Sequence, residues 1–274
     1  MTIEDRDPAA VVPDGDTGEP GAQGSRSSRS TDAEADARAA GGKKKHLPLW
    51  QETVLLLGIA LLLAIVIKAL FVQAFYIPSE SMEPGLVKND RILVQKMSYW
   101  FGGDPQRGDV VVFKDPGGWL SAAESAGPDN PVAKLMAKIG LYPQGGHLVK
   151  RVIGVEGDVI HCCDKKGRLE VNGVPLEEGD YARPGAEGCL GPMIGCDWTT
   201  EPVPDGHVFV MGDNRGHSAD STVHMCRERE TECVPGDEFI DTDLVVGKVF
   251  VLLWPADRFG FLHRPDTFAG VPAS

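Results

Sequence analysis

The segment FYIPSESMEPGL, residues 75–86, follows a long apolar run, and the interpretation of the whole chain depends on it. It places two serines, Ser79 and Ser81, a few residues beyond the end of that run. So short a stretch of chain cannot carry a side chain far from a membrane in which the run is embedded. We therefore expect Ser81 to be a nucleophile that is held close to a membrane surface.

The run itself predicts a membrane anchor. From Val54 to Val72 the chain is apolar except for Gly58 and Lys68. As a helix, these residues would rise roughly 28 Å, about the thickness of the hydrocarbon layer. We expect Lys68, near the far end, to extend its ammonium group to the interface, and a functional intramembrane lysine is the alternative.

Lysines precede this run and predict its orientation. Residues 43–45 are Lys-Lys-Lys, so the N-terminus is expected in the cytoplasm and the rest of the chain outside. A cleavable secretory signal is the competing interpretation, because Val72-Gln73-Ala74 has the small-residue character of a cleavage site. The run exceeds the usual 7–15 apolar residues and a long tail precedes it, which favours an uncleaved single-pass anchor.

Composition divides the chain into three parts. Residues 1–47 are a polar tail with a basic flank, expected to be disordered because such a composition buries too little apolar surface. Residues 48–74 form the anchor, and 75–274 form an extracytoplasmic domain. The formal net charge is −13, of which −2 lies in 1–72 and the remaining −11 in 73–274. So acidic a domain repels phosphates, and we expect no nucleic acid partner.

All six cysteines lie in the late part of the chain, which predicts an oxidising compartment and disulfides. Six cysteines allow about 15 pairings, and only Cys189 with Cys196 and Cys226 with Cys233 stand out as local possibilities. A zinc site is the alternative. It is disfavoured because no Cys-x-x-Cys occurs and the adjacent Cys162-Cys163 has poor ligand spacing. We expect neither a metal nor another cofactor.

Short apolar runs separated by Gly and Asp predict a mostly β fold, an antiparallel β domain behind the anchor. The runs expected to form strands lie within 90–96, 107–113, 147–155, 159–161, 169–171, 207–211 and 245–254. Two segments interrupt them as insertions, at about 115–146 and 178–204. The first contains an amphipathic helix from Pro131, expected to pack on its own domain rather than on lipid. The second, rich in Gly, Pro and acidic residues, is expected to be loop-like.

A serine nucleophile needs a base, and lysine is the better candidate here. His147 and His217 lie in interesting places, but the Gly-x-Ser-x-Gly motif is absent. In Ser-Lys enzymes a buried lysine takes the role, because apolar burial lowers its pKa. Lys150 stands in the apolar stretch 148–153, where β alternation would direct it to one face and Arg151 to the other. The plainer alternative is that one of these two basic residues is simply exposed.

Four stretches in order, after an anchor, resemble type I signal peptidases, the bacterial leader peptidases, in an actinobacterial-like form. Residues 78–84 (PSESMEP) resemble the family's nucleophile box, and 107–113 (RGDVVVF) resemble its structural box. Residues 150–158 (KRVIGVEGD) resemble the lysine box, and 212–221 (GDNRGHSADS) the last box. The resemblance implies a mixed, mostly β catalytic domain of the signal peptidase or Ser-Lys protease type, outside the membrane and anchored by one helix.

The resemblance also implies roles for individual residues. Ser81 would attack the scissile carbonyl, and Lys150 would take its proton and pass it to the leaving amine. Ser218 would orient Lys150, and the Ser79 hydroxyl would stabilise the oxyanion together with the Ser81 N–H. Supporting residues of the last box would be Asp213, Arg215 and Asp220. The pocket for small side chains would be lined by Ile77, Met82, Leu86, Leu148 and Val149.

Turn formation alone is the alternative explanation for Ser218 and Asp220. The chain also departs from the family pattern in the last box. Gly216-His217 replaces the usual pair, and Thr222 stands where an arginine usually pairs with the aspartate. Gly85 replaces a common threonine. None of these departures touches Ser79, Ser81, Lys150 or Ser218.

The implied activity is that of a membrane-bound serine endopeptidase with a Ser/Lys dyad. It would remove N-terminal signal peptides from secreted precursor proteins, cleaving after small residues in an Ala-x-Ala-like pattern. Its partners would be these precursors and the lipid bilayer, and it would function as a monomer in the cell membrane. Two alternatives are a non-catalytic membrane scaffold and a cytosolic, self-cleaving repressor-like protease. The anchor and the acidic domain oppose the second.

Overall fold

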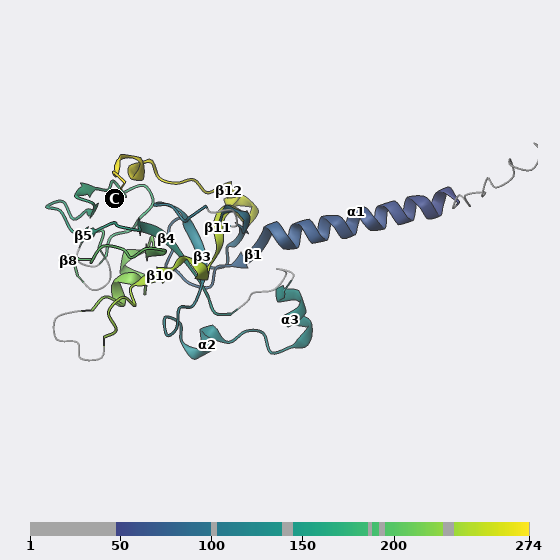
Figure 1. The fold of residues 1–274 in the computed structure, drawn as a ribbon, viewed down its shortest axis with the longest axis horizontal. Coiled ribbons are helices and arrows are strands. Elements are labelled where there is room, and N and C mark those ends of the chain that lie inside the picture. The colour runs from purple at the N-terminus through teal and green to yellow at the C-terminus, as the bar shows by residue number, and fades with distance from the viewer. Residues whose placement is uncertain are drawn as a thin grey trace, which may run out of the picture. The chain divides into compact units, whose positions relative to one another are not determined.

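The computed structural model describes residues 48–99, 103–138, 145–185, 188–191, 195–226 and 233–273 (Figure 1). The predicted disordered tail, 1–47, lies outside these residues. Two compact units divide between Glu52 and Thr53, and the elements that follow α1 belong to the second unit. The predicted fold class is confirmed: the second unit is built mainly from antiparallel sheets.

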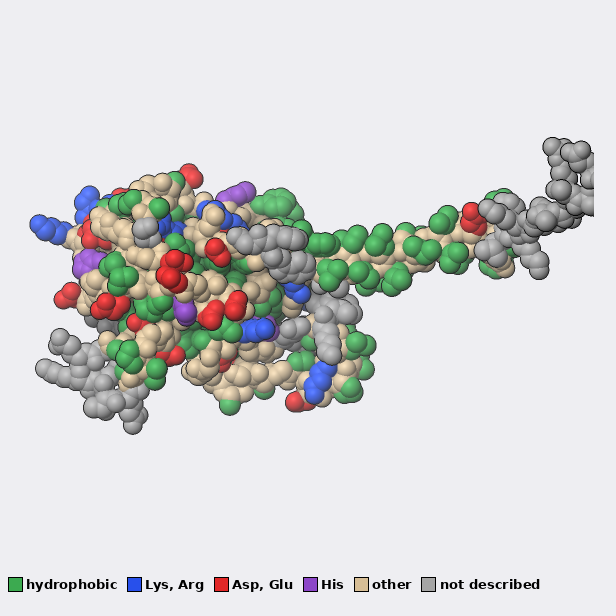
Figure 2. Space-filling model, in the orientation of Figure 1, with side chains coloured by type: hydrophobic (Ala, Val, Ile, Leu, Met, Phe, Trp, Pro, Cys, Tyr) green, Lys and Arg blue, Asp and Glu red, His purple; other side chains and the backbone are tan. Residues whose placement is uncertain are grey.

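The predicted anchor forms helix α1, Leu49–Phe71. Its Leu49–Ile67 portion has a mean hydropathy of 2.2 and is long enough to cross a membrane. Hydrophobic side chains cover the helix along its length (Figure 2), as expected for a surface that faces lipid. The helix ends at Phe71 rather than at residue 74, because Val72–Ala74 already pair with the next strand. The side chain of Lys68 lies outside the described part of the structure.

The large sheet has eight strands in the order β1-β2-β11-β3-β4-β9-β10, with β12 paired to β11. Its strands are β1 Val72–Tyr76, β2 Arg91–Gln95, β3 Val110–Lys114, β4 His147–Val155, β9 His207–Met211, β10 Phe239–Asp241, β11 Val245–Trp254 and β12 Gly260–Phe261. The predicted strands within this set are confirmed, whereas β1, β10 and β12 were not predicted. The order places β4, which carries Lys150, between β3 and β9.

The segment 115–146 connects two neighbouring antiparallel strands, β3 and β4, whose ends pair Lys114 with His147. Its described part contains α2, Ala122–Ser125, and α3, Pro131–Lys138. The predicted helix from Pro131 is therefore confirmed. The apolar side chains of α3 that face solvent are Val132, Leu135 and Met136, whereas Ala137 is buried.

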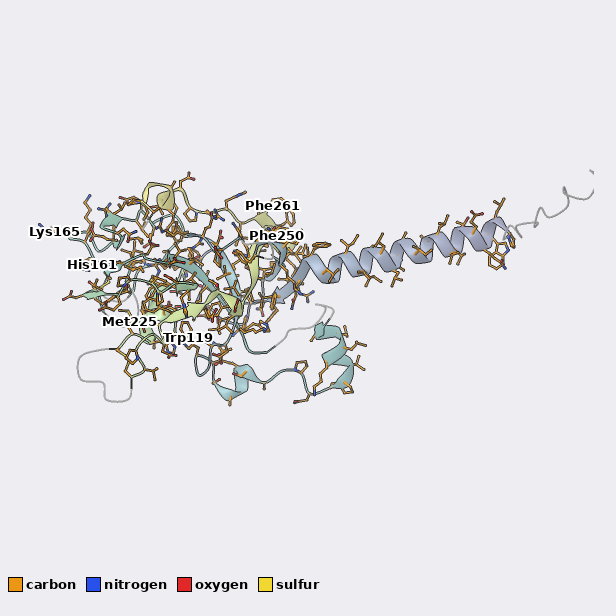
Figure 3. All side chains as sticks on the ribbon, viewed as in Figure 1. Trp119, His161, Lys165, Met225, Phe250 and Phe261 are labelled. Atoms are coloured by element: carbon orange, nitrogen blue, oxygen red, sulfur yellow. A yellow bond between two sulfur atoms is a disulfide. The ribbon has the colours of Figure 1, made fainter. Side chains whose placement is uncertain are left out.

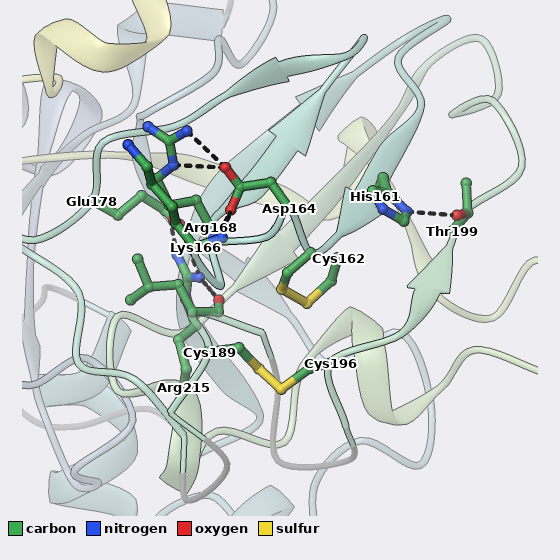
Figure 4. Close-up of a disulfide and its surroundings, with 12 residues drawn as sticks. His161, Cys162, Asp164, Lys166, Arg168, Glu178, Cys189, Cys196, Thr199 and Arg215 are labelled. Atoms are coloured by element: carbon green, nitrogen blue, oxygen red, sulfur yellow. Dashed lines mark hydrogen bonds and ion pairs between the residues drawn. A yellow bond between two sulfur atoms is a disulfide. The ribbon is translucent and has the colours of Figure 1, made fainter.

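The small sheet has the order β7-β6-β5-β8. Its strands are β5 Ile160–Cys162, β6 Leu169–Val171, β7 Val174–Pro175 and β8 Trp198–Thr199. The strands predicted within 159–161 and 169–171 are confirmed as β5 and β6, which pair with each other. All six cysteines are paired: Cys162 with Cys163 and Cys189 with Cys196 (Figure 4), and Cys226 with Cys233. Three sulfurs lie within 4.8 Å of one another here, but all belong to disulfides and none is a free thiolate ligand.

Three groups of buried side chains fill the domain. One lies between the small sheet and β9, around Ile160, Leu169 and Phe209. The second packs the segment before Ser81 against β2 and β11, around Ile77, Met82 and Val94. The third lies around Phe113, Val152 and Val210. The second group contains neighbours of Ser81 and the third contains residues of β4, which carries Lys150, so packed side chains support both candidate catalytic residues.

Candidate active site

Ser81 lies in the loop between β1 and β2, and short hydrogen bonds close this loop at its base. The Ile77 N–H donates to the Asp90 carbonyl at 2.9 Å, and the Val87 N–H donates to the Asp90 carboxylate at 2.8 Å. Ser81 is only 7% exposed, and its Oγ lies 3.2 Å from Ser79 Oγ. The structure therefore brings the predicted nucleophile and the predicted oxyanion donor together.

Lys150 is buried on β4, and its ammonium or amine group points to a hydroxyl. Its Nζ donates to Ser218 Oγ at 3.0 Å, and Ser218 Oγ donates to Asp220 Oδ2 at 2.6 Å. Burial lowers the pKa of Lys150, while the charges of Asp220 and Asp213 oppose this shift. Among the described residues, Lys150 Nζ makes no direct hydrogen bond to Ser81 Oγ. Such contacts are often long before substrate binds.

Arg151, the next residue, is buried as well, so the interpretation that one of these two basic side chains is simply exposed is wrong. Alternation turns Arg151 to the opposite side of β4, where both its Nε and Nη2 bond Asp213 at 2.7 Å. Burial alone would lower the pKa of Arg151, but the ion pair with Asp213 outweighs it and the pKa is raised. Asp213, predicted to be a supporting residue, thus forms an ion pair with Arg151, and the sequence did not predict this pairing.

Asp220 anchors the turn that carries Ser218. Its carboxylate accepts hydrogen bonds from the Gly212 N–H at 2.9 Å, the Ser218 hydroxyl, the Thr222 N–H at 3.2 Å and the Thr222 hydroxyl at 2.7 Å. Thr222 therefore supplies two donors at the place where the family usually has an arginine. Four donors satisfy a fully buried carboxylate without a cation beside it. The departure at Thr222 consequently leaves this turn braced.

Asn214 ties the last box to the nucleophile loop. Its N–H donates to the Ser81 carbonyl at 3.0 Å, and its side-chain amide donates to the Glu80 carbonyl at 3.1 Å. Gly212 lies beside them in a place where any side chain would collide. A Cβ there would stand 2.3 Å from Ser218 Oγ and 2.4 Å from the Ser81 carbonyl oxygen. Backbone contact between the two boxes thus fixes the position of Ser81 relative to Ser218.

Arg215 is completely buried, and its partner comes from the segment 178–204, which was expected to be loop-like. Its Nη2 and Nη1 bond the Glu178 carboxylate at 2.6 and 3.2 Å (Figure 4), and its Nε donates to the Gly212 carbonyl. The Tyr181 hydroxyl also bonds Glu178, and Arg151 stacks 4.5 Å from the Tyr181 ring centre. The start of the segment 178–204 is loop-like as predicted, and its residues Glu178 and Tyr181 also belong to the support of the site.

A groove of about 610 Å³ contains Ser79, Ser81 and Lys150. The predicted pocket residues that line it are Ile77, Met82, Leu148 and Val149. Leu86 is not among its lining residues: it is buried in the core beside Ile77 and Met82. His147 and His217 also border the groove. A larger cavity of about 770 Å³, next to Arg107 and Arg264, contains none of the predicted site residues.

Comparison with known proteins agrees with this arrangement. The family model described as signal peptidase, peptidase S26, matches residues 50–254, and the chain belongs to this family. Members are serine peptidases, and this chain is a hydrolase that removes signal peptides from precursor proteins. Helix α1, the one helix among the described residues that is apolar and long enough to cross a membrane, fits an enzyme anchored in a membrane.

The relatives include two mycobacterial proteins. A probable signal peptidase I of Mycobacterium leprae is 38% identical over 236 residues, 79% of this chain and 80% of that protein. A signal peptidase I of Mycobacterium tuberculosis is 37% identical over 257 residues, 87% of this chain and 85% of that protein. A crystal structure of a signal peptidase I from Enterococcus faecalis covers 53% of this chain and 95% of its own, with 21% identity and a TM-score of 0.28. That likeness is too low to add to what the family model shows.

Proposed function

We propose that Ser81 and Lys150 form the catalytic dyad of this signal peptidase. The observation that carries the proposal is the joint position of both residues in one groove, with Lys150 buried and bonded to Ser218. A lysine acts as a base only when its amine is neutral, and burial favours that form by lowering the pKa. Because the Ser218 hydroxyl donates a hydrogen bond to Asp220, its oxygen is free to accept a hydrogen bond from Lys150. The lone pair of the Lys150 amine is then available to Ser81.

In the first half-reaction, Ser81 Oγ attacks the carbonyl carbon that precedes the scissile bond while Lys150 Nζ takes the hydroxyl proton. A C–O bond forms, and negative charge gathers on the former carbonyl oxygen. The Ser79 hydroxyl and the Ser81 N–H would donate to this oxygen, and one such donor is typically worth about 2.7–4 kcal/mol of barrier. The C–N bond then breaks, and Lys150 returns the proton to the leaving amine.

In the second half-reaction, water replaces the amine. Lys150, neutral again, removes a proton from water as the water oxygen attacks the ester carbonyl. The bond to Ser81 Oγ breaks, and the proton returns to the serine. The cycle ends with a free carboxylate on the signal peptide, the mature protein with a new N-terminus, and the enzyme unchanged.

We further propose the finer specificity and topology. The pocket of Ile77, Met82, Leu148 and Val149 would accept small side chains, which supports cleavage after an Ala-x-Ala-like pattern. Residues before α1 would lie in the cytoplasm and residues 75–274 outside, supported by the lysines at 43–45 and the paired cysteines. The enzyme would work as a monomer in the lipid bilayer of the cell membrane.

Cleavage of a secretory precursor by the full-length protein in detergent tests the dyad. Ser81→Ala and Lys150→Ala are each expected to lower the rate by about 10⁴-fold or more. Lys88→Ala is the matched control, because Lys88 is an exposed lysine in the same loop as Ser81, and it should retain full activity. Circular dichroism should show that all variants are folded. Full activity of Lys150→Ala would disprove the dyad.

A non-catalytic scaffold was the alternative suggested by Thr222 and Gly216-His217. The reason for this alternative is weaker than the sequence suggested, because Thr222 donates two hydrogen bonds to Asp220. A wild-type preparation that cuts no precursor would revive it.

A further inference from the structure

We propose that part of the connection between β3 and β4 forms an outer wall of the substrate groove and contacts the signal peptide several residues before the scissile bond. This outer wall consists of Trp119, Leu120, Glu124, 126–128 and 145–146. The proposal rests on the proposed function, since it concerns the same groove. It assigns to this chain a specificity determinant for the segment that precedes the small residues at the cleavage site.

The connection is much longer than joining the strands requires. Lys114 pairs with His147 across the hairpin of β3 and β4, and the Asp115 N–H donates to the Gly146 carbonyl at 3.0 Å. Two residues suffice to connect antiparallel strands that are already in register. The connection instead leaves the sheet at Asp115 and returns at Gly146 along the groove.

Trp119 fixes the start of the outer wall on the domain (Figure 3). Its ring is 8% exposed, stacks on the His224 ring with centres 4.2 Å apart, and meets the Phe113 ring edge-on. Its Nε1–H is buried and has no hydrogen-bond partner among the described residues. A buried aromatic anchor of this kind holds the following residue, Leu120, at a defined place beside the groove.

Backbone contacts fix the other end of the outer wall. The Gly146 N–H donates to the Glu124 carbonyl at 3.2 Å. Gly145 packs so closely on Ala126 that a Cβ on Gly145 would stand 2.4 Å from the Ala126 carbonyl oxygen. A capping box between Ser121 and Glu124 orders the short helix α2 between these contacts. Contacts with neighbouring residues therefore fix the outer wall at both of its ends.

Its position along the groove defines which part of the substrate it meets. Leu148 and Val149, the proposed pocket residues, are followed in the direction away from Lys150 by His147 and then Gly146. From Lys150 to Gly146 is four residues of strand, roughly 13 Å at about 3.3 Å per residue. An extended peptide lying along β4 would thus reach the outer wall about four residues before the scissile bond.

The lining groups define the chemistry that this part of the peptide should have. Leu120 and Pro128 present apolar surface, and Glu124 adds a carboxylate. Hydrogen bonds from the Ser121 hydroxyl and N–H hold the pKa of Glu124 below its usual range, so it stays charged near neutral pH. The outer wall should therefore favour an apolar or basic residue and disfavour an acidic one.

Peptide length provides the main test. Two peptides share the same small residues and cleavage site, but one begins three residues before the scissile bond and the other eight. For full-length wild-type enzyme in one detergent, kcat/KM of the long peptide should exceed that of the short one. Leu120→Ala should reduce this ratio by about tenfold, as expected for lost apolar contacts, and leave the short peptide unaffected. A wild-type ratio near one, or a Leu120→Ala ratio equal to wild type, would overturn the proposal.

Val132→Ser is the matched control. Val132 is an exposed apolar residue of α3 in the same connection, but it does not line the groove. Its length ratio should equal that of wild type, and this also controls for partition of the longer peptide into micelles. A loss as large as that of Leu120→Ala would indicate a general effect of the connection and overturn the assignment to the outer wall.

Peptide charge provides an independent test, which holds even if Leu120→Ala fails to fold. Two long peptides carry Lys or Glu at the fifth residue before the scissile bond. Wild type should cleave the Lys peptide faster by severalfold, and Glu124→Gln should equalise the two, while Gln preserves the capping box. An unchanged preference in Glu124→Gln would contradict the proposal. A failure of the proposed dyad can be distinguished from a failure of the outer-wall proposal. If the dyad were wrong, Ser81→Ala would still cut the short peptide.

Discussion

Two neighbouring basic residues lie on the two faces of β4, and their pKa values are shifted in opposite directions. Lys150 and Arg151 are 4% and 6% exposed, so burial is nearly the same for both. Lys150 faces a hydroxyl, Ser218 Oγ, and its pKa is lowered; Arg151 faces the Asp213 carboxylate, and its pKa is raised. Burial alone therefore does not make a base. A base results where burial is combined with a neutral hydrogen-bond partner.

The comparison also separates two energetic roles. The Arg151 face is a network of paired charges that includes Asp213, Arg215 and Glu178. The Lys150 face holds a group whose charged form is disfavoured by its surroundings. We thus expect removal of the two basic side chains themselves to change stability in opposite directions, and the following variants test the two faces.

The largest expected effect comes from breaking the paired face. Arg151→Met would leave the buried Asp213 carboxylate without its cation, which should lower the free energy of unfolding by about 3–5 kcal/mol. Urea unfolding of the detergent-solubilised protein measures it. The double variant Arg151→Met with Asp213→Asn should recover much of the loss, because no uncompensated charge remains. Equal stability of the single variant and wild type would show that the pair does not hold the site together.

The next effect concerns the brace of the Lys150 face. Thr222→Val removes the hydroxyl that bonds Asp220 Oδ1 at 2.7 Å, and a hydrogen bond to a charged group is worth about 1.5–3 kcal/mol. The melting temperature and the free energy of unfolding should both fall. Thr222→Ser keeps the hydroxyl and serves as the control. If Thr222→Val were as stable as Thr222→Ser, the replacement of the family's arginine would need another explanation.

Lys150→Met should act in the opposite direction from Arg151→Met. Removing a buried amine whose charged form is disfavoured should raise the free energy of unfolding at pH 7 by about 1 kcal/mol, with activity lost. In wild type the folded pKa lies below the unfolded value of about 10.4, so the folded state binds fewer protons. Wild-type stability should therefore gain from rising pH up to about 10.4, and Lys150→Met should lack this gain. A less stable Lys150→Met would contradict the comparison.

The smallest effect is a displacement of the pH profile. The Asp220 charge opposes the lowering of the Lys150 pKa, so Asp220→Asn should lower that pKa further. The acid limb of the pH profile of kcat/KM reports the pKa of the base in the free enzyme. It should then move to lower pH, even if the maximal value of kcat/KM also changes. Asp205→Asn, at an exposed aspartate in the turn before β9, should leave the limb in place. A limb that moves to higher pH in Asp220→Asn would exclude Lys150 as the titrating group.

The candidate catalytic residues were easier to predict from the sequence than the ion pairs that hold them in place. Ser81, Lys150 and Ser218 could be located because each stands in a short motif that resembles one family. The bonds that hold them join Arg151 to Asp213 over 62 positions and Glu178 to Arg215 over 37. No periodicity connects residues so far apart, and an acidic residue in a Gly- and Pro-rich stretch looks like any solvated loop residue.

Among the elements, strands β4, β9 and β11 had patterns clear enough to give their bounds. Strand β1 was missed because its first residues continue the apolar character of α1 and only pairing with β2 distinguishes them. Leu86 was assigned to the pocket by the family resemblance, but it is buried in the core, and a buried core and a pocket wall need the same residue types. Burial direction is a property of the folded chain that composition does not encode.

The most direct test of the account is to titrate Lys150 itself. NMR of the full-length protein labelled with ¹⁵N at lysine Nζ would follow its resonance with pH, and Lys150→Met would assign it. We predict that Lys150 titrates below the ordinary lysine value of about 10.4, because burial lowers its pKa. A Lys150 that titrates at or above that value would be charged in the working enzyme, and it could not serve as the base for Ser81.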